Sequence, residues 1–271
     1  MILENASASH PGLVRLSNED ALGHRLPESP EVLATKGALF GVADGVGGAA
    51  AGEVASQAAV ATLMAEYYSP RASYRVESAL RQAVQASNLQ VYNLAHGGNG
   101  ALYGMQTTLT ALVLAAGTAY IAHVGDSRAY HLRGGTLTQL TGDHSEAAEL
   151  LRLRLITPEQ AANHPRRNVL TRALGSHPTL RPDFSRVQLR ADDRFLLCTD
   201  GLWGELDHEI LSQVVQRTPA TACADLVDLA CRHGGGDNVS LQVIRVVQPG
   251  TAIQSGPPGR IARLLAGLRG G

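Results

Sequence analysis

Several aspartates stand beside glycine at the ends of apolar runs, where a carboxylate can be presented without crowding. They are Asp44 before Gly45, Asp126 after Gly125, Asp200 before Gly201 and, in a fourth glycine-containing stretch, Asp237 after Gly236. A single aspartate of this kind is ordinary turn chemistry. Its repetition indicates a site for a hard cation, because Mg²⁺ and Mn²⁺ prefer oxygen ligands in octahedral geometry, with water in the remaining positions.

The elements that would position these aspartates can be predicted from periodicity. Residues 39–43 form a short apolar run, typical of a buried strand that delivers Asp44 to a glycine-rich turn. A largely apolar helix is expected over 52–68. A second helix is expected over 73–95, where apolar residues recur at three- and four-residue steps.

The rest of the chain alternates between β-rich and helical patterns. Strands are predicted at 107–115, 118–124, 128–132, 137–140, 195–199 and 240–247, and helices at 206–216 and 221–231. Ala116-Gly117 and Arg133-Gly134-Gly135 are typical of hairpin turns, so the first four of these strands are predicted to form an antiparallel meander. The fold class is therefore α+β, with helices over the outer faces of antiparallel sheets.

Residues 145–168 interrupt this pattern with two short helices. The second begins with Thr157 as its cap, Pro158 at the first helical position and Gln160 completing a capping box. We expect a surface flap here. Its basic end, Arg166-Arg167, is either a solvated face or, beside a phosphate site, an aid in holding an anionic substrate.

The composition argues against several classes of protein. The 271 residues carry a net charge of −1, so the chain has no basic field for nucleic acid or an anionic membrane. No apolar run approaches the ~20 residues of a membrane span, and residues 1–10 lack the features of a secretory signal. The three cysteines show no CxxC spacing, which fits a reduced compartment. We expect a cytoplasmic location and no stable membrane insertion.

The domain organisation is predicted to be simple. One domain is expected over residues 1–248. From Pro249 the composition turns to Gly, Pro, Ser and Gln, which predicts a linker and a flexible tail over 249–271. The basic and leucine residues of that tail leave docking on the body, or contact with a partner or a membrane surface, as alternatives.

Eight stretches, in this order, resemble the metal-dependent PPM (PP2C-type) serine/threonine protein phosphatases in their bacterial stand-alone form. They are residues 15–20, 42–48, 107–109, 123–130, 140–145, 168–175, 198–203 and 236–240. Each motif alone is weak, but their order and spacing extend the resemblance over residues 8–247. The resemblance implies a central β-sandwich of two antiparallel sheets flanked by helix pairs, with metals in a cleft at one end.

The resemblance also implies a set of metal ligands. Asp44 would bridge two divalent cations, Mn²⁺ or Mg²⁺, and the carbonyl of Gly45 would bind the second. Asp200 and Asp237 would complete the shell of the first. Asp126, with Asp200, would help to bind a weaker third cation.

Three further residues receive roles from the same resemblance. Glu19 and Asp20 would act near the second cation through bound water, and Arg15 would hold the substrate phosphate. Arginine suits that task because its guanidinium can fork onto two oxygens. Several carboxylates held this close together repel one another unless cations are present, which argues against a purely structural cluster.

The implied reaction is hydrolysis of phosphoserine and phosphothreonine in proteins, opposing a Ser/Thr kinase. Two cations would offset the phosphate charge and generate a bridging hydroxide that attacks directly, without a phosphoenzyme. Arg15, Asp44 and Asp200 would carry the catalysis. We expect phosphorylated proteins and a cognate kinase as partners, no nucleic acid, and a monomer.

Two positions depart from the family pattern. Val46 stands where many eukaryotic members carry a histidine that is a candidate general acid, and Gln106 stands where the family usually has glycine. His123 and His144, beside matching motifs, are expected to be structural. Cys198, in an apolar run, is expected to belong to the core.

Three alternative functions share these features. A phosphoprotein-binding pseudophosphatase would keep the fold without activity, although the intact aspartates argue against it. A regulatory phosphatase of an anti-sigma-type partner would share the chemistry, but such enzymes usually carry sensory domains. A hydrolase of small phosphomonoesters is distinguishable only by comparing rates on phosphopeptides and small esters.

Overall fold

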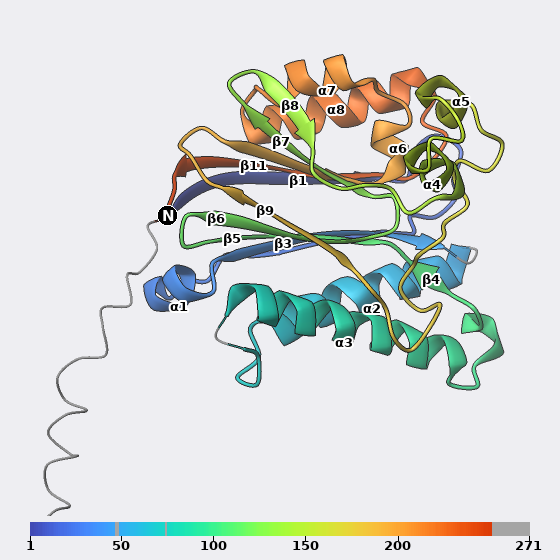
Figure 1. The fold of residues 1–271 in the computed structure, drawn as a ribbon, viewed down its shortest axis with the longest axis horizontal. Helices are drawn as coiled ribbons and strands as arrows, with labels where there is room; N and C mark the ends of the chain where they lie inside the picture. Colours follow the sequence, from blue (N-terminus) through green and yellow to red (C-terminus); the bar gives the residue numbers. More distant parts are fainter. Residues whose placement is uncertain (47–48, 74, 251–271) are drawn as a thin grey trace, which may run out of the picture.

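The computed structural model describes residues 1–46, 49–73 and 75–250 of the chain. Two antiparallel sheets face each other between outer layers of helices (Figure 1). The first sheet has the order β1 (Ile2–His10), β11 (Val239–Gln248), β10 (Arg194–Cys198), β7 (Arg128–Arg133) and β8 (Thr136–Gln139). The second has the order β2 (Asp20–Arg25), β3 (Ala38–Val46), β5 (Leu109–Ala115), β6 (Thr118–Val124) and β9 (Asp183–Gln188), with β4 (Gln106–Thr107) paired to β3. The predicted α+β sandwich is confirmed.

Strand β3 shows why the layers form. Alternate side chains point to opposite faces of a strand. Leu39 and Ala43 pack in a core with α2 (Ala49–Tyr67) and α3 (Val76–His96), whereas Phe40 and Val42 pack between the two sheets. A continuous apolar run therefore serves two interfaces at once, which explains why 39–43 is apolar at every position except Gly41.

Helices α7 (His208–Val214) and α8 (Pro219–His233) cover the outer face of the first sheet. The remaining helices are α1 (Pro30–Thr35), η1 (Gly100–Leu102), α4 (Glu146–Arg152), α5 (Pro158–Ala162) and α6 (Asp200–Trp203). Within residues 1–46, 49–73 and 75–250, no helix combines the length and the apolar character that crossing a bilayer requires.

The predicted single meander is wrong, because its four strands are divided between the sheets. β5 and β6 belong to the second sheet, and β7 and β8 to the first. The chain crosses between them at Gly125, whose φ is +103° and where a Cβ would lie 2.5 Å from the Thr108 side chain. The two hairpin turns are confirmed, since Ala116, Gly117, Gly134 and Gly135 all have positive φ.

Some elements carry no clear local signal. β1 and β9 were not predicted, because their half-exposed residues mix polar and apolar types. Nor were β2 and helix α1 predicted, which lie within residues 20–36. The predicted capping box at Thr157 is confirmed. The predicted linker and tail cover residues 249–271, of which 251–271 lie outside the described residues.

Candidate active site

Five aspartates interact with one another at the end of the sandwich where α6 begins. Figure 1 shows α4 and α6 at that end. Asp44 lies near the end of β3 and Asp20 begins β2, where the two are cross-strand partners. The other three, on the first sheet or its connections, are Asp126 between β6 and β7, Asp200 at the start of α6, and Asp237 just before β11. The cluster therefore draws on both sheets.

Two threonines hold Asp44 in place through its backbone. Its N–H donates to Thr108 Oγ1 at 2.9 Å, and its carbonyl accepts from Thr107 Oγ1 at 2.7 Å. Thr108 Oγ1 lies 2.6 Å from Ser127 Oγ, which connects β3 to the loop that carries Asp126. The strand pairing also brings the two departures from the family pattern together, because Gln106 and Val46 are direct cross-strand partners.

A glycine pair lets the Glu19 segment approach the end of β3. Gly45 donates its N–H to the Glu19 carbonyl at 3.1 Å, and a Cβ on Gly45 would lie 2.1 Å from the Gly52 carbonyl oxygen. A Cβ on Gly52 would lie 1.9 Å from Glu19 Oε2. Gly52 is thus a site residue that motif spacing did not identify. Gly47 and Gly48 of the same motif lie outside the described residues.

Asn238 organises the loop that carries Arg15 and Glu19. Its side-chain oxygen accepts from the Glu19 N–H at 2.8 Å. Its amide nitrogen donates to the carbonyls of Pro11 and Ser17, each at 2.9 Å. Asn238 therefore shapes a segment more than 200 residues away from it in sequence.

The electrostatics of the cluster favour a bound cation. Burial and the charges of Asp200, Asp20 and Asp126 raise the pKa of Asp44 well above its usual value. Burial, with the charge of Asp200, raises the pKa of Asp20 and of Asp126 to about 8. Burial and the charge of Asp237 raise the pKa of Asp200. Positive charge placed among these groups would let all of them ionise.

The donor set fits divalent cations that retain water. One carboxyl oxygen of Asp20 accepts from Thr199 Oγ1 at 2.9 Å. The other, Oδ1, is buried without a hydrogen-bond partner in the described part of the chain. In that same part, no three His, Cys, Asp or Glu side chains are already grouped closely enough to enclose one ion. Mg²⁺-like cations need few protein ligands because they keep several waters.

Arg15 reaches the cluster from the loop between β1 and β2. Its Nη2 donates to Asp237 Oδ2 at 2.7 Å, and the two side chains are 52% and 38% exposed. The structure therefore brings the expected phosphate anchor to the site, in contact with an expected cation ligand.

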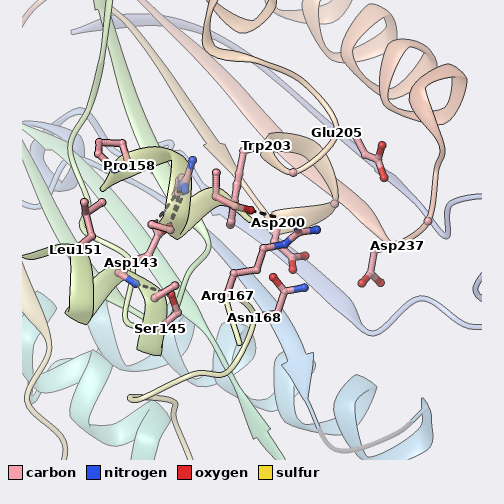
Figure 2. Close-up of a pocket in the computed structure, with 18 residues that line it drawn as sticks. Asp143, Ser145, Leu151, Pro158, Arg167, Asn168, Asp200, Trp203, Glu205 and Asp237 are labelled. Carbon is pink, nitrogen blue, oxygen red and sulfur yellow. Dashed lines mark hydrogen bonds and ion pairs between the residues drawn. The ribbon is translucent and has the colours of Figure 1, made fainter. Parts of the chain in front are cut away.

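A cavity of about 560 Å³ extends from the cluster toward the insert formed by α4 and α5 (Figure 2). Asp200 and Asp237 line one part of it, and Leu151 and Pro158 line another. Of the two arginines at the end of the insert, Arg167 lines the cavity. Arg166 instead pairs with Glu146 at 2.7 Å.

Two buried histidines support the site from behind. His123 lies 2.9 Å from Thr110 Oγ1 and 3.1 Å from the Gly142 carbonyl through its two ring nitrogens. His144 Nδ1 accepts from the Gly125 N–H at 3.1 Å. Their expected structural role is confirmed. Cys198 is fully buried, and burial raises the pKa of its thiol, so its place in the core is also confirmed.

Comparison with known proteins agrees with this architecture. The arrangement of two antiparallel sheets between helix layers is shared with solved structures of bacterial serine/threonine phosphatases. The model of the family "Protein phosphatase 2C" matches residues 15–227, and the chain belongs to this family.

Individual relatives show how far the similarity extends. The chain is 38% identical over 250 residues to "Serine/threonine protein phosphatase PstP" of Mycobacterium tuberculosis, covering 91% of this chain and 46% of that protein. The chain thus spans less than half the length of this relative. It is 38% identical over 208 residues to "Serine/threonine phosphatase stp" of Listeria monocytogenes, covering 75% of this chain and 82% of that protein. The solved structure of the catalytic domain of PstP in complex with two manganese ions superposes on this chain with a TM-score of 0.77 at 37% identity. The match covers 90% of this chain and 97% of that one.

Proposed function

We propose that this chain hydrolyses phosphoserine and phosphothreonine in proteins and depends on divalent cations to do so. The observation that carries the proposal is the convergence of buried carboxylates from both sheets around Asp44, where Asp20 is its cross-strand partner and the charges of Asp200 and Asp126 help to raise its pKa. A protein gains little stability from such a cluster unless cations occupy it. The cavity beside the cluster leaves room for a phosphorylated segment.

The proposed cation ligands are Asp44, the carbonyl of Gly45, Asp200 and Asp237, with Glu19 and Asp20 acting through water and Asp126 serving a weaker third cation. Two bound cations, Mn²⁺ or Mg²⁺, would offset the phosphate charge and lower the pKa of a water so that it attacks phosphorus directly. This scheme needs no covalent phosphoenzyme intermediate. Cys198 is fully buried, so its thiol is not available as a nucleophile.

The chain's own residues then bind and orient the substrate. Arg15 exchanges Asp237 for the phosphate and forks onto two of its oxygens. Val46 has no titratable group, and a water held by the cations would give the leaving serine or threonine oxygen its proton. The phosphorylated proteins would be products of a Ser/Thr kinase that this enzyme opposes.

The test is phosphate release from a phosphothreonine peptide with Mn²⁺, with excess chelator, and with Asp44→Asn and Asp237→Asn variants. The proposal expects Mn²⁺-dependent release that chelator and both variants abolish. Asp228→Asn is the matched control, because this aspartate is 56% exposed and pairs with Arg232 on α8. Peptide binding without release by folded protein would favour a binding module. Faster turnover of small esters than of peptides would favour a general phosphomonoesterase.

A further inference from the structure

We propose that the α4–α5 part of the cavity binds an apolar side chain of the phosphorylated protein, close to its phosphorylated residue. This apolar seat is formed by Ala147, Ala148 and Leu151 from α4 and by Pro158, Ala161 and Ala162 from α5. The proposal rests on the proposed phosphatase function and adds a substrate preference to it.

The seat lies in the same cavity as the carboxylates. Asp200 and Asp237 line that cavity, and Trp203 lies between them and Leu151 in the close-up (Figure 2). A segment whose phosphate reaches Asp200 can therefore continue along Trp203 toward the insert. The volume of about 560 Å³ is within the range of pockets that enclose more than a phosphate group.

Two of the charged groups beside the seat, Arg128 and Asp143, neutralise each other. Arg128 donates to Asp143 through Nε at 2.9 Å and through Nη2 at 2.6 Å. The Arg128 guanidinium also lies 3.5 Å from the centre of the Trp203 ring. The charges of Arg128 and Asp143 are thus paired with each other within the cavity wall. The seat itself presents mainly carbon atoms to a bound side chain.

One further charged side chain, Arg167, lies at the α5 edge of the seat, where its Nη1 donates to the Ala162 carbonyl at 3.1 Å. Figure 2 places Arg167 beside Asp200 and Glu205 near Asp237. Against Leu151 and the alanines of α4, away from Arg167, a charged or strongly polar side chain would lose hydration without gaining an opposite charge. An apolar side chain would gain by burying its surface against Leu151 and the alanines. The chemistry of the wall therefore selects an aliphatic neighbour of the phosphorylated residue.

The experiment compares two phosphothreonine peptides that differ only at the positions flanking the phosphothreonine, which are leucine in one and serine in the other. The native chain with Mn²⁺ should show a kcat/KM about ten-fold higher for the leucine peptide, as expected for one buried aliphatic side chain. Leu151→Asp and Ala161→Asp, on different helices, should each bring this ratio close to one. Because the two substitutions lie on different helices, a loss of the ratio in both variants cannot be caused by misfolding of one helix.

Leu155→Asp is the matched control, because Leu155 is 67% exposed in the same insert and lies outside the seat. It should keep the native ratio. Equal kcat/KM for the two peptides with the native chain would overturn the seat while leaving the phosphatase function intact. A ratio that survives both seat variants, or that falls equally with Leu155→Asp, would overturn it as well. Absence of Mn²⁺-dependent release from either peptide would instead overturn the proposed function.

Discussion

Arg15 and Asp237 form an ion pair across 2.7 Å, although 222 positions separate them in the sequence. The pair joins the proposed phosphate anchor to a proposed cation ligand. Arg15 and a cation thus compete for the same carboxylate. Cation binding at Asp237 would release the guanidinium for the phosphate, so that the anchor becomes available when the cations are in place.

Arg15→Ala should lower kcat/KM for a phosphothreonine peptide by about ten- to a hundred-fold, because charge-assisted hydrogen bonds contribute about 1.5–3 kcal/mol. The kcat/KM of Arg15→Lys should lie between those of the native chain and Arg15→Ala, since lysine keeps the charge but cannot fork onto two oxygens. Mn²⁺ affinity, measured by calorimetry, should stay equal or increase because the competing ion pair is gone. Arg217→Ala, which removes a surface pair with Asp225, is the control. Weaker Mn²⁺ binding by Arg15→Ala would contradict the competition.

The stability of chelator-treated protein should fall as pH rises from about 7 to about 8.5. Burial and the Asp200 charge raise the pKa of Asp20 and Asp126 to about 8, against an ordinary value of 3.8. The folded state therefore holds protons that the unfolded state has already released, and raising the pH favours unfolding. Each such group lowers the free energy of unfolding by up to about 1.4 kcal/mol per pH unit.

Between about pH 7 and about 8.5 the pH dependence of stability reports on the aspartates and not on the buried histidine His123. Burial lowers the pKa of His123 to about 3, so both folded and unfolded states carry this histidine neutral above its ordinary value of 6.5. Urea unfolding at several pH values, with chelator or with saturating Mn²⁺, measures the effect. Mn²⁺ should flatten the dependence because ionised carboxylates then have a counter-charge. A flat profile in chelator would show that these aspartates are ionised in the folded protein.

Gly52→Ala should abolish most of the Mn²⁺-dependent activity while leaving the fold intact. The added methyl would lie 1.9 Å from Glu19 Oε2 and 2.9 Å from the Gly45 carbonyl oxygen, so the Glu19 carboxylate must move. Gly100→Ala is the matched control, because a Cβ there meets nothing within 4 Å. Circular dichroism should be native for both variants. Native activity in folded Gly52→Ala would contradict a role for this close approach.

Asp193→Asn should cost about 3 kcal/mol of stability, the scale for breaking a buried ion pair, without changing the metal dependence of activity. The Asp193 side chain is fully buried and accepts from Arg133 Nε at 2.7 Å and Nη2 at 2.6 Å. Its neighbour Asp192 is 71% exposed and pairs with Arg245. Asp192→Asn should therefore cost no more than about 1 kcal/mol. Equal losses for the two variants in urea unfolding would refute the distinction.

Local sequence alone was enough to predict the features that depend on neighbours in the chain. The apolar run at 39–43 predicted the core of β3, the periodicity at 73–95 predicted α3, and Thr157 predicted the start of α5. The positions of the aspartates at strand ends were likewise readable, because a strand end and its turn are set by adjacent residues.

Only the tertiary structure decided which of these parts meet. The pairing of Asp20 with Asp44 follows from the β2–β3 register, and the division of the predicted meander follows from the crossing at Gly125. Neither leaves a local signal, since both depend on how two sheets pack. The same holds for the Arg15–Asp237 pair and for Gly52 against Glu19. Such contacts are decided by long-range packing, whereas residue spacing along the chain reports only on local structure.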